Sequence, residues 1–115
     1  MVVRDGSAET TDQVFQALAN ATRRDILRRS GEGDLSVTQL ADAYDMSFAA
    51  VQKHVAILER AGLISKQRSG REQLVRAEAE ALLWARQALD DLEATWRGRV
   101  DRMAGLLAND HREAK

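Results

Sequence analysis

Residues 36–62 read SVTQLADAYDMSFAAVQKHVAILERAG. Ser36 and Gln39 have the spacing of a capping box, and the residues that follow them are apolar at helical intervals. Ser47 can cap a second helix, and Gly62 suits the position just beyond a helix C-terminus. Two short helices joined by a tight turn are typical of a helix-turn-helix.

The helix-turn-helix, which we assign to residues 36–61, has an amphipathic second helix. Its apolar side chains fall within one arc, and the opposite arc is mostly small or polar. A major groove accepts such a face, because Lys53 can donate to guanine O6/N7 and Gln52 can pair with adenine N6/N7. The alternative is a face that is only solvated. The candidate DNA contacts here are Ser47, Phe48, Ala49, Gln52, Lys53 and His54.

Two of these side chains have more than one interpretation. His54 lies at the border of the apolar arc, so it either packs and braces the helix or reaches a phosphate. Phe48 either contacts a thymine methyl group or packs against the preceding helix. Ser47 is expected to cap the helix and also to lie near a phosphate, because helix N-termini bind anions.

Residues 63–77 predict a β-hairpin, since a Ser-Gly turn dipeptide lies between two short extended stretches. The hairpin carries Lys66, Arg68 and Arg71. We expect these side chains to contact the DNA backbone or the minor groove, as a wing beside the helix-turn-helix. The alternative is a hairpin that is basic only for solubility.

The positive charge of the chain is concentrated in one segment. The whole chain has 17 basic and 18 acidic residues, for a formal net charge of −1. Residues 46–76 hold six of the bases and only two of the acids, a surplus of four positive charges. The remainder of the chain is acidic. Such a distribution is expected of a protein that presents one surface to nucleic acid.

Short helices are also expected before the helix-turn-helix. Thr11 or Asp12 can start the first helix, after a flexible N-terminus at residues 1–10. Asn20 can cap a second helix, which precedes a turn at residues 31–34.

The last helix is predicted at residues 78–108, followed by a frayed tail at residues 109–115. Its apolar residues recur at intervals of three and four. A helix of about 30 residues is longer than a domain of this size can cover, so part of the stripe is expected to contact a second subunit. The stripe residues proposed for that contact are Leu89, Leu92, Trp96, Val100 and Met103.

Several segments match one known family in the correct order. The segment NATRRDIL at residues 20–27 resembles the opening of ArsR-family regulators. The most specific match is VQKHVAILERAGLI at residues 51–64, which resembles the family's recognition-helix signature. Ser69-Gly70-Arg71 takes the place of the family's wing tip. The resemblance covers about residues 12–100.

The resemblance implies a dimeric winged helix-turn-helix that represses transcription from operator DNA. It also implies that the first and last helices build the dimer, which adds Val14 and Phe15 to the predicted interface. Gln52 stands where the family often has Ser, and Phe48 where it often has Arg or another polar residue. These two differences bear on which bases are contacted.

The residues for metal binding or catalysis are missing. The chain has no Cys, which excludes disulfides and thiolate chemistry. The family's thiolate metal motif would fall at residues 37–42, which read VTQLAD, and the carboxylates of the last helix have only His111 nearby, in the tail. We predict no metal site, no cofactor and no catalytic residues.

We interpret the chain as a single domain, residues 1–115, that is mostly α with a small β-hairpin: a dimeric winged helix-turn-helix with a long C-terminal dimerisation helix. Its predicted function is sequence-specific binding of double-stranded operator DNA, as a homodimeric repressor that does not sense metal and that can regulate its own operon. No inducer is indicated. We expect a cytoplasmic location and no membrane span. The alternative function is a winged helix that binds protein.

Overall fold

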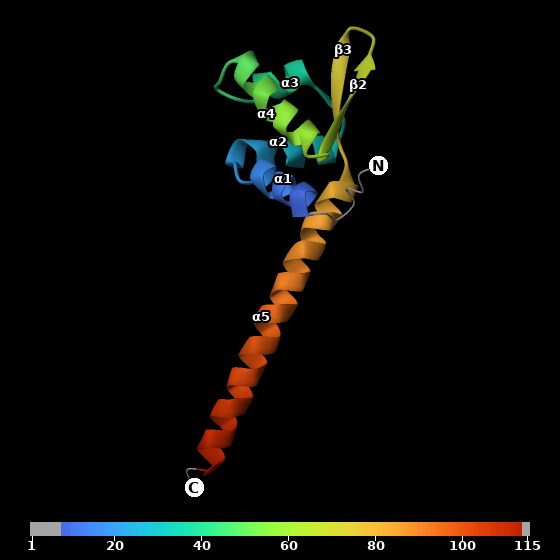
Figure 1. Cartoon of the computed structure of the whole chain (residues 1–115). Coiled ribbons are helices and arrows are strands. Elements are labelled where there is room, and N and C mark those ends of the chain that lie inside the picture. The colour runs from blue at the N-terminus through green and yellow to red at the C-terminus, as the bar shows by residue number, and fades with distance from the viewer. Residues whose placement is uncertain (1–7, 114–115) are drawn as a thin grey trace, which may run out of the picture. The chain divides into compact units, whose positions relative to one another are not determined.

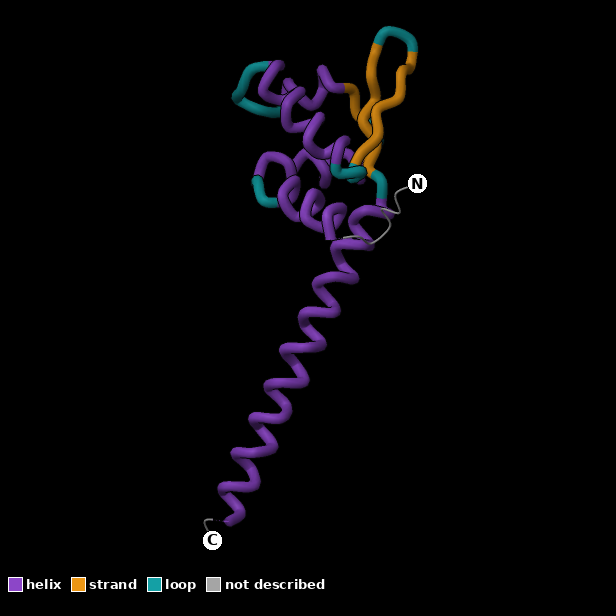
Figure 2. Tube along the Cα trace, in the orientation of Figure 1, coloured by secondary structure: helices purple, strands orange, loops and turns teal. Residues whose placement is uncertain are grey.

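The computed structural model of the chain describes residues 8–113 (Figure 1). In chain order the elements are α1 (Ala8–Leu18), α2 (Ala21–Glu32), β1 (Leu35–Ser36), α3 (Val37–Asp42), α4 (Phe48–Arg60), β2 (Ile64–Ser69), β3 (Glu72–Ala77) and α5 (Ala79–Glu113). Two units are distinguished, one up to Ala85 and one from Arg86 onward, and α5 begins in the first and continues in the second. The fold is mostly α with a small sheet, as predicted, and Figure 2 shows the long strands of the hairpin in orange among the purple helices.

The first unit has one hydrophobic core to which all of its helices and its sheet contribute. Val14 of α1, Ile26 of α2 and Leu40 of α3 have no exposed area. The apolar arc predicted for α4 faces this core, since its residues at helical intervals are buried: Val51, Val55 and Leu58. Burial of this arc turns the small and polar side of α4 toward solvent.

The sheet is antiparallel, with the strand order β1-β3-β2. In the hairpin Ser69 pairs with Glu72, and Gly70 at the tip has a φ of +63°, which favours glycine. The strand β1 was not predicted from the sequence. It has two residues, Leu35 and Ser36, which are too few to show an alternating pattern, and it exists because β3 offers it a partner.

The caps that begin and end the helix-turn-helix are those predicted. Ser36 and Gln39 form a complete capping box on α3, and the Ser47 hydroxyl accepts the Ala50 N–H at 3.1 Å. At the end of α4, the Gly62 N–H donates to the Glu59 carbonyl at 2.9 Å, and the following N–H returns to Leu58. Gly62 has a φ of +77°, the left-handed conformation that this helix stop requires.

Several boundaries differ from the predicted ones. α1 begins at Ala8, inside the N-terminus predicted at residues 1–10 to be flexible; residues 1–7 lie outside the described part. α2 continues through Gly31 to Glu32, where a turn was expected, because Arg28 and Glu32 form an ion pair across its last turn. α5 runs to Glu113, since the polar residues beyond Ala108 include neither Pro nor Gly to stop it.

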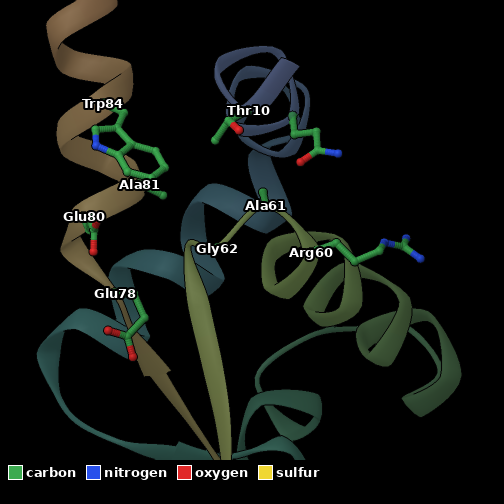
Figure 3. Close-up of a pocket in the computed structure, with 9 residues that line it drawn as sticks. Thr10, Arg60, Ala61, Gly62, Glu78, Glu80, Ala81 and Trp84 are labelled. Carbon is green, nitrogen blue, oxygen red and sulfur yellow. The ribbon is translucent and has the colours of Figure 1, made fainter. Parts of the chain in front are cut away.

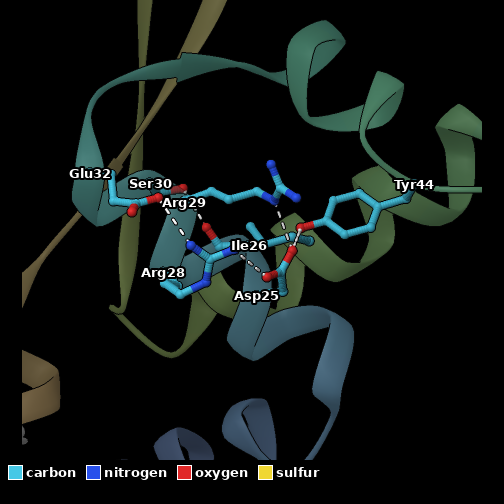
Figure 4. A network of polar contacts seen from close by, with 7 residues as sticks. All are labelled: Asp25, Ile26, Arg28, Arg29, Ser30, Glu32 and Tyr44. Atoms are coloured by element: carbon cyan, nitrogen blue, oxygen red, sulfur yellow. Dashed lines mark hydrogen bonds and ion pairs between the residues drawn. The ribbon is translucent and has the colours of Figure 1, made fainter.

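A polar network joins α2 to the turn of the helix-turn-helix (Figure 4). The Asp25 carboxylate accepts hydrogen bonds from the Tyr44 hydroxyl at 2.6 Å, Arg28 at 2.7 Å and Arg29 at 2.8 Å. Tyr44 lies between α3 and α4, with the Arg29 guanidinium over its ring. The Tyr44 hydrogen bond and the two arginines hold the pKa of Asp25 well below its ordinary value, while burial and Asp25 raise the pKa of Tyr44 to about 12.

Replacing Asp25 with asparagine is expected to lower the free energy of unfolding near neutral pH by about 1 kcal/mol. It is also expected to flatten the pH dependence of that free energy in acid. In the wild type, the depressed pKa means that the carboxylate stabilises the fold fully above its ordinary pKa of 3.8 and progressively less as the pH falls below it. Urea unfolding at a series of pH values measures this, with Asp42→Asn on α3 as the control. Identical acid sensitivity in Asp25→Asn and the wild type would contradict the role of Asp25.

The second unit is the remainder of α5. Large apolar side chains along it are exposed, among them Leu89 (54%), Trp96 (63%) and Met103 (55%). These three are spaced by seven residues, the interval of a helical seam that contacts another helix. Within residues 8–113, no helix is long and apolar enough to cross a membrane.

Candidate nucleic-acid interface

The N-terminal half of α4 presents an exposed face of mixed chemistry. Phe48 is 47% exposed, and Ala49, Gln52 and Lys53 are exposed beside it. The spacing of four places Gln52 one turn beyond Phe48, and Lys53 one turn beyond Ala49. The face is therefore apolar in the first turn of α4. One turn later it carries an amide and a positive charge. The four residues were predicted together, and the structure brings them to one face.

His54 lies behind this face and braces α4 against α1 and α2. Its Nδ1 atom is 3.3 Å from an amino group of Arg23, and the side chain is half-buried. Because a guanidinium only donates, Nδ1 accepts and the proton of the neutral ring is on Nε2. Burial, together with the positive charge of Arg23, lowers the pKa of His54. Of the two roles open for His54, the geometry favours the brace.

Arg23 and Arg24 donate hydrogen bonds to backbone carbonyls. Arg23 donates to the carbonyls of Ala17 at 2.7 Å and Gln16 at 3.0 Å, and Arg24 donates to the carbonyl of Leu18 at 2.7 Å. These carbonyls end α1 and have no partner within their own helix. The two arginines therefore cap α1, and Arg23 links that cap to His54 and the recognition helix. The sequence singles out these arginines by the Thr-Arg-Arg segment. Only the fold identifies the carbonyls that accept their hydrogen bonds.

Strand register decides which side chains of the wing face α4. Lys66 lies opposite Val75, and Arg68 lies opposite Gln73, so these four side chains share a face of the hairpin. Val75 is fully buried, which turns this face toward the core and α4 at the base of the wing. Arg68 and Gln73 lie one pair further out on the same face. Gln73 was not among the predicted contacts.

Ionic contacts at the base of the wing involve Lys66 and a further basic residue of β3, Arg76. The Lys66 ammonium is 3.4 Å from the Glu59 carboxylate of α4, and Arg76 pairs with Asp34 at 2.9 Å. The Ser65 hydroxyl also donates to Glu78 at 2.6 Å. Lys66 was predicted as a DNA contact. In the structure its ion pair with Glu59 links β2 to α4. The Lys66–Glu59 pair links the wing to the recognition helix, and the Arg76–Asp34 pair links it to the segment before β1.

Four cations of the basic segment have no carboxylate partner among the side chains of residues 9–108. Two come from α4, Lys53 and Arg60, and two from the wing, Arg68 and Arg71. All four are exposed. Arg71 lies at the hairpin tip beside Gly70, and Lys53 lies near the middle of α4. Recognition helix and wing thus each supply unpaired positive charge.

The predicted dimer contacts divide into buried and exposed residues. Val14 has no exposed area in the single chain, because α1 packs it into the core. Its role in the dimer contact stays a prediction. Phe15 is half-buried against the same core. The α5 residues are exposed and remain predictions: Leu89, Leu92, Trp96, Val100 and Met103.

A pocket of about 380 Å³ lies at the other end of α4 from this face (Figure 3). The Trp84 indole and Ala81 of α5 form one wall, and Gly62 and Thr10 lie across from them. It contains two carboxylates, Glu78 and Glu80, on its α5 side. Among the described residues, no group of three or more His, Asp or Glu side chains could hold a metal ion.

Known proteins similar to this chain are regulators of transcription. A family described as a helix-turn-helix domain matches residues 18–67. The HTH-type transcriptional regulator Rv2034 of Mycobacterium tuberculosis is 34% identical over 69% of this chain and 74% of its own length. The solved ArsR-like transcriptional regulator from Rhodococcus sp. RHA1 has a TM-score of 0.74 and 32% identity, over 85% of this chain and 92% of that one. This chain belongs to the ArsR family.

Two further ArsR-type proteins bear on function. The arsenical resistance operon repressor of Escherichia coli is 29% identical over 84% of this chain and 81% of its own length. The homodimeric winged helix-turn-helix DNA-binding domain from Mycobacterium bovis, a possible ArsR-family regulator, has a TM-score of 0.61 and 28% identity over 79% of this chain and 91% of that one. As an ArsR-family member, this chain is a DNA-binding transcriptional regulator and not an enzyme.

Proposed function

We propose that this ArsR-family regulator is a homodimeric repressor that binds an operator in double-stranded DNA, its own promoter included. The observation that carries the proposal is the exposed face of α4 beside a wing, with unpaired cations on both: Lys53, Arg68 and Arg71. A helix of this character fits the major groove, and basic side chains beside it neutralise phosphates. A dimer would place two such helices about one helical turn of DNA apart, on an imperfect palindrome.

We propose in addition that this repressor does not sense metal, so that no bound metal relieves repression. The chain has no Cys, and the segment Val37–Asp42 holds no pair of soft ligands where the family's thiolate motif falls. The E. coli relative is named for arsenical resistance. Arsenic sensing through thiolates would require cysteines, and this chain has none.

A fluorescence-anisotropy titration tests the function, using labelled duplex from the protein's own promoter and a scrambled duplex of the same composition. We expect tight binding to the promoter and weak binding to the scrambled duplex. With three phosphate contacts per subunit, and therefore six in the dimer, the logarithm of the binding constant should fall with the logarithm of salt concentration with a slope of about −5.

Repeating the titration with zinc or arsenite should leave the promoter affinity unchanged. Release of the DNA by either ion would refute the proposal that the repressor does not sense metal. Equally weak binding to both duplexes, across several promoter fragments, would contradict specific repression and favour the winged helix that binds protein.

A further inference from the structure

Phe48 is placed where a side chain of the recognition helix meets its target first. It is the first residue of α4, directly after the Ser47 cap, and 47% of it is exposed. The preceding helix α3 therefore does not bury it, which was one of the two roles considered for it. Covering an exposed aromatic ring at this position with an apolar partner would contribute favourable free energy to binding.

The neighbours of Phe48 indicate what that partner is. Ala49 is small, Gln52 offers an amide one turn later, and Lys53 adds an unpaired positive charge. A cation beside the ring favours an anionic partner, and the wing continues the same positive surface through Arg68 and Arg71. An apolar ring set among unpaired cations fits a base edge between phosphates, whereas protein interfaces keep charge away from their buried centre.

Among the four bases, only thymine presents an apolar group in the major groove, its C5-methyl. A guanine, cytosine or adenine edge placed against Phe48 would lose water from polar atoms that the ring cannot satisfy. Gln52 has the complementary preference, because its amide can donate to adenine N7 and accept from adenine N6. Both side chains on this strip of α4 therefore select A·T pairs.

The spacing of the two side chains sets the spacing of the base pairs. One turn of helix separates Phe48 and Gln52, a rise of about 6 Å along α4. Base pairs stack at about 3.4 Å, so side chains one turn apart reach pairs that are one or two steps apart.

We propose that Phe48 is a specificity-determining residue that contacts a thymine methyl group, and that Gln52 reads an adenine one or two base pairs away. Each operator half-site then has an A·T-rich centre. The inference rests on the proposed function, since α4 must enter the major groove.

The test removes one methyl group from the DNA. A bound sequence is first selected from a random duplex library with the full-length protein. Each thymine of one half-site is then replaced singly by deoxyuridine, which pairs identically but lacks the methyl. We expect one position per half-site at which deoxyuridine weakens binding about fourfold, the effect of burying one methyl group. The Phe48→Ala variant should bind the thymine and deoxyuridine duplexes equally.

Leu83→Ala is the matched control, because Leu83 is an exposed apolar residue on α5 and not on α4. It should keep the fourfold discrimination whatever its absolute affinity. No sensitive thymine at any position, or discrimination that survives in Phe48→Ala, would overturn the assignment of Phe48 while leaving DNA binding intact. A selection that enriches no sequence at all would instead count against the proposed function, and with it the inference.

Discussion

Reversing the charge of Lys53, Arg68 and Arg71 together, each to glutamate, is expected to weaken operator binding at least about 100-fold. The three side chains are exposed, and none has a carboxylate partner among the described residues, so they are available to phosphates. In a dimer six attractive contacts become repulsive. The slope of binding constant against salt should fall by about 5 for the same reason. Single alanine variants at Lys53 and Arg71 should each show a smaller loss.

The measurement is the anisotropy titration at several salt concentrations, with circular dichroism to verify folding. The single variant Lys53→Glu is compared with the control Arg97→Glu, which makes the same charge change. Arg97 lies on the second unit and pairs with Glu93. The control should change affinity by less than about twofold, since salt screens exposed charges beyond about 10 Å. A triple variant that keeps both the affinity and the salt slope of the wild type would rule out the proposed contact surface.

Placing an aspartate at Leu92 is expected to separate the subunits of the proposed homodimer, with a loss of association of at least about 100-fold. Leu92 is 57% exposed in the single chain and lies on the same side of α5 as Leu89 and Trp96. In a paired seam an aspartate from each subunit would lose water and meet its own copy. Operator affinity should fall with dimerisation, because each subunit supplies one recognition helix.

Sedimentation equilibrium of the full chain measures this association directly. Ala94→Asp makes the same charge change two residues along the helix, about 200° around its axis from Leu92. Ala94 is also exposed, and this variant should remain dimeric. If Leu92→Asp sediments as a dimer with wild-type strength, the subunits associate through another surface.

The local signals in the sequence were strong where a short-range rule applies. The capping residues Asn20, Ser36 and Ser47 all do what their positions predict, because a cap is a hydrogen bond to an amide three residues away. The Gly62 stop depends likewise on the conformation of one residue. The apolar arc of α4 then determines which of its faces is exposed, and with it the candidate contact residues.

Long-range partners were not accessible in this way. Arg23 contacts His54 across 31 positions, and Arg76 contacts Asp34 across 42. Many acids and carbonyls along the chain are equally suitable partners for an arginine by chemistry alone, so composition and spacing cannot choose among them. The same holds for Val14, whose apolar character suits either a core or an interface.

By itself, then, the sequence determined the helix-turn-helix, the hairpin, the basic segment and the apolar stripe of α5. Each of these follows from periodicity, capping or charge within a short window. Only the tertiary structure decided that β1 pairs with β3, that Lys66 is linked to Glu59, and that Phe48 is left exposed at the start of α4. These are properties of which surfaces meet when the core closes, and that depends on residues far apart in the chain.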